Sequence, residues 1–302
     1  MIGPFLEQAG LMLRVLPHVA AEVCFALKGG TAINFFLRDM PRLSVDIDLT
    51  YLPVEARKDT LAGIGGALVR IEARILRAMP GILIQKGLYE GGVYKLFVRG
   101  PAGEVKIEPN LVIRGAVLPP VQRELCPEGG RKFRMALSVK TLSDADLYGG
   151  KICAALDRQH PRDLFDIKLL LANEGLTDAI RKAFIIYLVS HDRPMHELIN
   201  PRRKDFRRVF ENEFSGMTEV PVSYEELIAA REYLFSRLQS ELTGAERKFI
   251  LSVKEGSPDW KLLDLPGVEK LPAIQWKLRN IAKMSPAKHR EQLRKLKERL
   301  GL

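Results

Sequence analysis

Two aspartates near the N-terminus are the side chains of this sequence best suited to chemistry. Asp46 and Asp48 lie in the segment Ser44–Thr50, in which valine, isoleucine and leucine occupy the alternate positions. In an extended strand both carboxylates point to one side, about 7 Å apart at a rise of ~3.3 Å per residue. Carboxylate oxygens are the ligands that Mg²⁺ prefers in phosphoryl-transfer sites. The pair therefore predicts a magnesium site, and an acidic strand face exposed to water is the alternative.

A glycine turn precedes these aspartates. Lys28–Thr31 follows the apolar run Val23–Leu27, which predicts a buried strand, and leads into a predicted helix over 32–38. Gly29 and Gly30 have no Cβ, so their backbone can take a positive φ and lie close to a ligand. The free N–H groups at a helix start favour an anion. We therefore expect the phosphates of a nucleotide to bind at this turn.

Four charged residues further along the chain are candidates for the same site. Glu108 ends an alternating strand and could be a third metal-binding carboxylate, or an ordinary exposed strand charge. Lys151 lies in a predicted helix and could supply a cation for a triphosphate, or be a solvated lysine. Asp163 and Asp166, three residues apart, share one helical face. Asp163 could hold Lys151 or Arg158 in place or act as a further acid, and structural ion pairs are the alternative for both aspartates.

The hydrophobic pattern predicts an α+β protein with two domains. Residues 1–141 combine helices with short strands separated by glycine turns, so they predict a mixed sheet that ends near residue 108. Residues 142–302 keep a helical period. The predicted strands are 23–27, 44–50, 81–85, 94–99 and 104–108. The predicted helices are 1–22, 32–38, 53–77, 144–158, 162–171, 177–191, 203–214, 224–242, 245–254, 271–284 and 286–300.

Charge points to an anionic partner. The 302 residues carry a formal net charge of +10, with a pI near 9.5. Much of the excess lies in residues 275–302, where nine Lys or Arg face only Glu291 and Glu298. Nucleic acid, a nucleotide or an acidic protein would each fit this charge.

Other composition features exclude several classes of protein. The longest apolar run, Ala183–Val189, is far shorter than a membrane-spanning helix, and the N-terminus has no basic region typical of a signal peptide. The three cysteines are widely spaced in apolar surroundings and are expected to be reduced. The histidines show no zinc-binding spacing. We therefore expect a cytoplasmic protein with no membrane partner and no zinc site.

Several motifs, taken in order, resemble those of one known family. They are KGGTA (28–32), RLSVDIDL (42–49), DADLYGGK (144–151), RDLFDI (162–167) and the segment 258–278. This ordered set resembles the AbiEii/AbiGii toxins, which belong to the DNA polymerase β-like nucleotidyltransferase superfamily. The resemblance covers essentially the whole chain, and the complete set is more specific than the first motif alone.

The resemblance implies a polymerase β-like N-terminal domain and a toxin of a type IV toxin–antitoxin system. It also implies an NTP substrate, a site for two Mg²⁺ ions and a cognate antitoxin; relatives include the MenT enzymes, which add nucleotides to the acceptor end of tRNA. The matching positions are Gly29, Gly30, Ser44, Asp46 and Asp48 in the first motif, Lys151 in the third, and Asp163 or Asp166 in the fourth. Gly149 stands where Ala or Ser is usual, and Thr31 where Ser is common.

Three functions are therefore considered. The first is Mg²⁺-dependent transfer of nucleotides from NTP to RNA, with the tRNA 3′ end as acceptor, which would block translation. The second is nucleotidyl or phosphoryl transfer to a protein or small molecule. The third is a catalytically silent binding module, which the intact Asp46, Asp48 and Lys151 disfavour.

Overall fold

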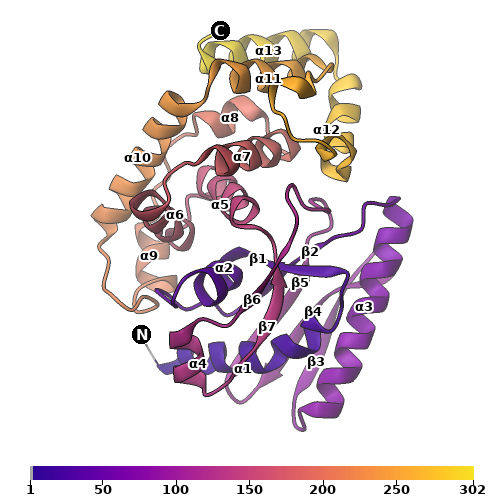
Figure 1. The fold of residues 1–302 in the computed structure, drawn as a ribbon, viewed down its shortest axis with the longest axis vertical. Helices are drawn as coiled ribbons and strands as arrows, with labels where there is room; N and C mark the ends of the chain where they lie inside the picture. Colours follow the sequence, from indigo (N-terminus) through magenta and orange to yellow (C-terminus); the bar gives the residue numbers. More distant parts are fainter. Residues whose placement is uncertain (1–2) are drawn as a thin grey trace. The chain divides into compact units, whose positions relative to one another are not determined.

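The structure, a computed structural model, describes residues 3–302 and has the predicted α+β class (Figure 1). Residues 1 and 2, at the start of the predicted helix 1–22, lie outside the described part. The chain divides into two compact units. Unit 1 comprises residues 3–143 together with Ser215–Pro221, and unit 2 comprises Asp144–Phe214 and Val222–Leu302.

Unit 1 is built on a mixed seven-stranded sheet, counted over the described residues, with the order β3-β4-β5-β2-β1-β7-β6. The strands are β1 Phe25–Lys28, β2 Ile47–Tyr51, β3 Leu83–Tyr89, β4 Gly92–Gly100, β5 Gly103–Pro109, β6 Val121–Glu124 and β7 Ser138–Thr141. Strand β2 lies in the middle, antiparallel to β1 and parallel to β5. Because β2 pairs with a strand on each side, the backbone at Asp48 is held in place by both neighbours.

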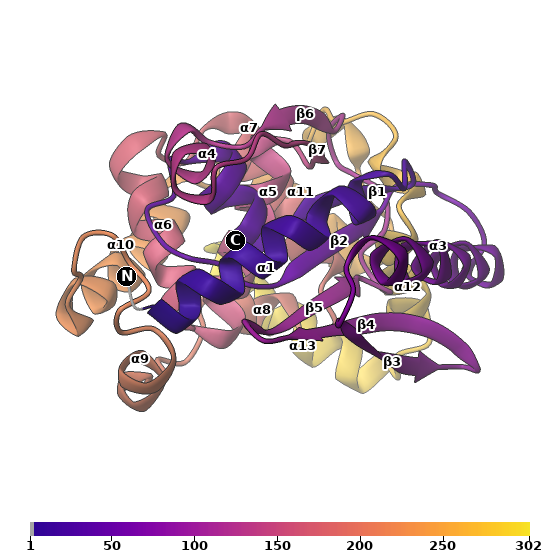
Figure 2. The same ribbon diagram turned by 90° about the horizontal axis from the view of Figure 1, so that it is seen from below.

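Helices of unit 1 cover the sheet, and one of them begins at the glycine turn 28–31. They are α1 Gly3–Ala20, α2 Gly29–Ala32, a π-helix at Ile33–Leu37, α3 Arg57–Ala78 and α4 Pro127–Phe133. Helices α1 and α3 contact each other, with α1 against β5 and α3 against β4 (Figure 2). Apolar residues on the sheet-facing side of each helix, among them Leu11 and Ile71, are completely buried. Burial of these stripes holds the sheet that positions the aspartates.

Several features of unit 1 differ from the sequence prediction, and α4 was not predicted at all. The sheet does not end near residue 108, because β6 and β7, which lie on either side of α4 in the sequence, continue it. Both strands have only four residues, and three of the four β6 residues are exposed, so an alternating apolar pattern is lacking. The helix predicted over 32–38 begins at Gly29 and becomes a π-helix. Finally, Ser215–Pro221 returns to unit 1, where Leu43 N–H donates to Met217 O at 2.8 Å.

Unit 2 is helical throughout its regular structure. Its α-helices are α5 Asp144–Arg158, α6 Pro161–Asn173, α7 Asp178–Ser190, α8 Met195–Ile199, α9 Arg207–Glu213, α10 Tyr224–Glu241, α11 Gly244–Glu255, α12 Pro272–Ala282 and α13 Pro286–Leu300. Helix α5 packs against both α6 and α7, and α11 packs against α13 (Figure 1). Ser223 and Thr243 form capping boxes that fix where α10 and α11 begin. The short α8 was not predicted.

Candidate active site

The two aspartates lie at the start of the central strand β2. Asp46 directly precedes the strand and Asp48 is its second residue. Ile47 and Leu49 are buried, as the alternating pattern predicts, whereas both aspartates are partly exposed. The strand thus anchors its apolar side chains in the core and leaves both carboxylates accessible to a ligand.

Gly29 and Gly30 are glycines because other side chains occupy the space that a Cβ would need. Gly29 has a φ of +71°, and a Cβ there would lie 2.7 Å from Asp48 Oδ2. A Cβ on Gly30 would lie 2.7 Å from Arg42 Nη2 and 3.0 Å from Ser44 Oγ. The register of β1 against β2 places Lys28 opposite Asp48. The backbone of the first helical turn therefore lies directly against the aspartate pair.

Thr31 and Ser44 connect the glycine turn to the segment that carries the aspartates. The Thr31 hydroxyl donates to the carbonyl oxygen of Asp46, and it lies 3.0 Å from Ser44 Oγ. Both side chains are buried. Both residues were predicted to contact a nucleotide. In the structure they also connect α2 to the segment 44–46 that leads into β2.

Arg42 is a structural residue of the motif that the sequence did not single out. Its side chain is only 1% exposed, and Nη1 donates to Leu43 O at 2.9 Å. Arg42 also forms an isolated β-bridge with Thr218. Its place in RLSVDIDL, directly before the aspartate strand, was the available signal. The buried guanidinium beside Gly30 places positive charge next to the turn that was predicted to bind phosphate.

Glu108 lies beside Asp48 but is held by two lysines. The parallel register of β2 and β5 aligns the two residues. Glu108 Oε1 is 2.6 Å from Lys95 Nζ, and Oε2 is 2.7 Å from Lys106 Nζ. Burial would raise the pKa of Glu108, but the charges of Lys106 and Lys95 outweigh it and lower that pKa. The proposed metal ligand therefore already has cationic partners, which the sequence analysis did not foresee.

Lys106 connects all three acidic residues electrostatically. Burial alone would lower the pKa of Lys106, yet the hydrogen bond that Lys106 donates to Glu108 and the charges of Glu108, Asp46 and Asp48 raise it. Within residues 3–302, no group of three or more His, Cys, Asp or Glu side chains is arranged to hold a metal ion. The paired oxygens of Asp46 and Asp48 nevertheless have the chemistry of a divalent-cation site.

The contact between Gly29 and Asp48 gives a direct test of this geometry. We expect Gly29→Ala to lower activity strongly, because its Cβ would displace the Asp48 carboxylate, and to cost about 1 to 3 kcal/mol of stability from backbone strain. Gly81→Ala is the matched control, since Gly81 has a φ of +82° but open space around it. Comparison of thermal unfolding and transfer rates separates strain from displacement. Equal activity in the two variants would contradict the assigned contact.

Unit 2 contains a second cluster of predicted site residues. Lys151 Nζ, on α5, lies 2.8 Å from Asp163 Oδ1 and 3.0 Å from Asp166 Oδ2, both on α6. Arg158 also donates to Asp163, through Nε and Nη2. The Lys151 side chain is 6% exposed and both aspartates are fully buried. The three predicted residues thus come together, with Lys151 held in one place by two carboxylates.

The electrostatics of this cluster favour its charged form. Burial would raise the pKa of Asp163, but the charges of Lys151 and Arg158 and the hydrogen bonds that they donate hold that pKa well below its usual range. Two cations, buried Lys151 and the more exposed Arg158, face two buried carboxylates, so the charges compensate each other. Asp163 therefore stays ionised at neutral pH and acts on Lys151 as a fixed anion.

Close packing of α5 against α7 explains why residue 149 is a glycine. A Cβ at this position of α5 would lie 2.7 Å from the backbone nitrogen of Phe184 and 2.8 Å from the carbonyl carbon of Ala183, both on α7. One turn earlier, Tyr187 of α7 donates to Asp146 of α5 at 3.1 Å. The glycine that replaces the usual Ala or Ser thus allows α7 to approach the helix that carries Lys151.

We expect Gly149→Ala to destabilise unit 2, because backbone atoms of α7 cannot move aside as a flexible side chain would. Overpacking of this kind costs about 1 to 3 kcal/mol. Gly66→Ala in α3 is the control, since its Cβ would meet only Arg70 Nη1 at 3.5 Å and alanine favours a helix. Chemical denaturation should therefore shift in opposite directions for the two variants. An unchanged midpoint for Gly149→Ala would refute the close approach of α5 and α7.

One known protein family matches most of this sequence. The sequence model of the nucleotidyl transferase AbiEii toxin family of type IV toxin–antitoxin systems matches residues 10–280. The chain belongs to this family. It is therefore a nucleotidyltransferase toxin, and membership implies an NTP substrate, usually with a divalent metal, and a cognate antitoxin. The resemblance inferred from the motifs is confirmed.

A solved structure supports the fold. MenT4, a nucleotidyltransferase toxin from Mycobacterium tuberculosis, superposes with a TM-score of 0.58 at 17% sequence identity, over 91% of this chain and 93% of that one. The predicted α+β nucleotidyltransferase fold is thus confirmed. No curated protein matches the sequence. Within the described residues, no helix is long and apolar enough to cross a membrane.

Proposed function

We propose that this toxin transfers nucleotides from NTP to the 3′ end of RNA, with the tRNA acceptor end as its substrate and Mg²⁺ as its metal. The observation that supports this most directly is the pair Asp46 and Asp48, held side by side by β2 with Gly29 against one carboxylate. Such an arrangement brings phosphate and metal ligands to one place. In the reaction the 3′-oxygen bonds to the α-phosphorus and pyrophosphate leaves.

Asp46 and Asp48 would hold Mg²⁺, with Glu108 as a further candidate ligand. Bound Mg²⁺ supplies positive charge for the triphosphate and lowers the pKa of the attacking hydroxyl. Glu108 would have to exchange Lys95 or Lys106 for the metal, because each of its oxygens is paired with one of these lysines. Lys106 balances the carboxylates by its charge, which limits their mutual repulsion.

The other residues of the motif position the nucleotide. Gly29 and Gly30 let the backbone approach the phosphates, and Lys28 lies opposite Asp48 with its positive charge. Thr31 and Ser44 hold the turn against β2. In-line transfer depends on such positioning and on electrostatic stabilisation rather than on covalent chemistry by the protein.

Lys151 is proposed to stabilise the charge of the triphosphate, with Asp163 and Asp166 as positioning residues. An oxygen of each aspartate lies within 3.0 Å of the Lys151 ammonium nitrogen, so the two carboxylates hold this group in place. Because the pKa of Asp163 is held well below its usual range by Lys151 and Arg158, Asp163 keeps its negative charge at neutral pH.

RNA is favoured as acceptor by the charge of the protein. The net charge is +10, and most basic residues of segment 275–302 are exposed along α12 and α13. Exposed lysines and arginines attract phosphates without reading sequence, and such binding weakens with salt. A protein or small-molecule acceptor would use the same aspartates, whereas the family assignment disfavours a catalytically silent module.

The acceptor can be identified by incubating the protein with Mg²⁺, total tRNA and each of the four NTPs, labelled on the α-phosphate, in turn. We expect label on tRNA, a mass gain of one or more nucleotides at its 3′ end, and no product when the 3′-hydroxyl has been oxidised with periodate. Label on protein and none on RNA would reject RNA as the acceptor and support the alternative. Replacement of Mg²⁺ by EDTA should abolish transfer.

A further inference from the structure

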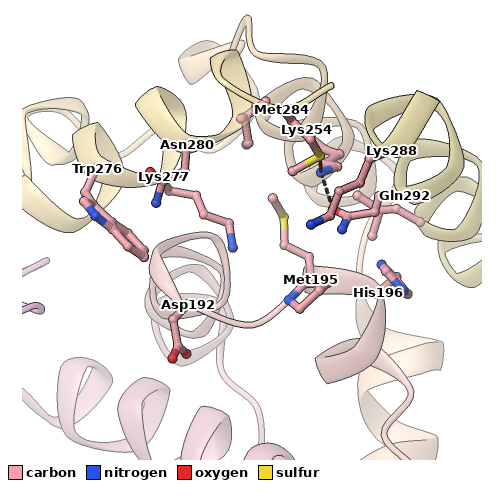
Figure 3. Close-up of a pocket in the computed structure, with 13 residues that line it drawn as sticks. Asp192, Met195, His196, Lys254, Trp276, Lys277, Asn280, Met284, Lys288 and Gln292 are labelled. Atoms are coloured by element: carbon pink, nitrogen blue, oxygen red, sulfur yellow. Dashed lines mark hydrogen bonds between the residues drawn. The ribbon is translucent and has the colours of Figure 1, made fainter. Parts of the chain in front are cut away.

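Unit 2 contains a pocket lined by three lysines. None of the residues proposed to act in catalysis lines it. The pocket has a volume of roughly 270 Å³ and is formed by α8, α11, α12, α13 and the loop before α8. Its polar lining includes Lys254, Lys277, Lys288 and Asn280, with Trp276 at one edge (Figure 3). A cavity with three amines and an indole on its wall, and the single carboxylate of Asp192, is suited to a small ligand that is anionic at one end and aromatic at the other.

Two of these lysines are buried without a carboxylate partner. Lys277 is 8% exposed, and its Nζ donates to His191 O at 2.6 Å and Arg193 O at 2.9 Å. Lys254 is 5% exposed, and its Nζ donates to Gln292 Oε1 at 2.6 Å, the dashed line in Figure 3. In the part of the chain that the structure describes, neither forms an ion pair. Each therefore retains positive charge that only neutral groups contact.

The buried position of these two lysines lowers their pKa values, which means that their charged forms are destabilised. Burial and the charge of Lys254 lower the pKa of Lys277 to about 8, although Asp192 acts weakly in the opposite direction. Burial and the charge of Lys288 lower the pKa of Lys254. Amines that repel one another in a partly dry pocket are stabilised by an incoming anion.

We propose that this pocket binds a nucleoside phosphate, whose phosphate contacts Lys254, Lys277 and Lys288 while its base lies against Trp276. In Figure 3 the side chains of Lys277 and Lys288 extend toward the middle of the pocket from opposite sides. Trp276 is 42% exposed, which leaves ring surface available for stacking. The apolar side chains of Met195, Ile281 and Met284 complete the wall. The ligand is either a free mononucleotide or the phosphorylated 5′ end of an RNA.

Fluorescence of Trp276 measures this binding without any catalytic turnover. The variant Trp260→Phe leaves Trp276 as the single tryptophan, because the chain contains two. It is titrated in EDTA with AMP, adenosine, a 5′-phosphorylated RNA hexamer and the same hexamer with a 5′-hydroxyl. We expect saturable quenching by AMP or by the phosphorylated hexamer and much weaker quenching by adenosine and the 5′-hydroxyl RNA. Response to AMP identifies a mononucleotide site, and response to the phosphorylated hexamer alone identifies an RNA end.

Charge variants decide whether the pocket is responsible. Lys277→Gln and Lys288→Gln should each weaken binding by about tenfold or more, since a charge-assisted hydrogen bond is lost. Lys288 is exposed, so its variant should fold even if Lys277→Gln does not. Lys248→Gln is the matched control, an exposed lysine of the same helix as Lys254. Equal affinities in all variants, or quenching by an acidic peptide but by neither phosphorylated ligand, would overturn the proposal. Since transfer is not measured, this outcome does not depend on the proposed function.

Discussion

Asp48→Asn should reduce nucleotide transfer by about a thousandfold or more, because the substitution removes a charged ligand from the site where transition-state charge is balanced. The amide has nearly the shape of the carboxylate, so the contact with Gly29 and the pairing of β2 persist. Growth inhibition in cells should disappear together with transfer. The measurement is incorporation of labelled nucleotide into RNA at saturating NTP and Mg²⁺.

Two comparisons make this result specific. Asp59→Asn changes an exposed aspartate of unit 1 that lies at the start of α3, and it should leave transfer unchanged. Thermal unfolding of Asp48→Asn should match or exceed that of the unchanged protein, because the repulsion between Asp46 and Asp48 is relieved. A folded Asp48→Asn protein that stays fully toxic would reject the metal assignment for this pair.

Lys151→Met should abolish activity and also destabilise unit 2, by about 3 to 5 kcal/mol, because it leaves the buried cluster with one cation for two carboxylates. The control is Lys168→Met, which removes the more exposed ion pair of α6 with Glu226 and should cost about 1 kcal/mol or less. Denaturant unfolding followed by circular dichroism gives both values. A stability loss no larger than that of the control would contradict the buried cluster.

The double variant Lys151→Met/Asp166→Asn separates stability from chemistry. It restores charge balance, since Asp163 keeps Arg158 as its partner, so much of the lost stability should return. Transfer should stay absent, because the cation proposed to act on the triphosphate is still missing. Recovery of both stability and transfer would show that Lys151 is a structural residue only.

Acid stability gives an independent measurement on the same cluster. The pKa of folded Asp163 lies below its ordinary value of 3.8, so its contribution to stability is present above about pH 4 and is lost as the pH falls toward the folded value. Asp163→Asn should therefore be less stable than the unchanged protein at pH 7, and the difference should shrink as the pH is lowered below 4. A difference that stays constant would contradict the ionised pair.

Much of the site could be read from local sequence. The alternation around Asp46 and Asp48 correctly predicted the burial of Ile47 and Leu49, because the period of a strand is two and its apolar face packs in the core, although Ser44 and Thr50 on the polar face are buried as well. The pair Asp163 and Asp166 on one face of α6 followed in the same way from the helical period. The glycine turn was recognised, although its helix begins at Gly29, three residues earlier than predicted.

Contacts between distant segments could not be read in this way. Lys106 shares a strand face with Glu108, as the alternating pattern indicates, but no local pattern brings Lys95 to Glu108, since that contact depends on the register of β4 against β5. The strands β6 and β7 were missed because four-residue strands are specified by their neighbours in the sheet rather than by their own pattern. The pocket with Lys254 and Lys277 likewise needs four helices to come together.

The sequence by itself determined the family, the α+β class and the identity of the acidic and basic candidates, because motif order and hydrophobic period are properties of the chain alone. Only the tertiary structure decided how these groups are paired. It placed Lys151 between two buried aspartates, gave Gly149 the backbone of α7 as its neighbour and left Lys254 and Lys277 without carboxylates. Burial and partner choice set the charge and the position of an ionisable group, and both arise only when distant segments pack together.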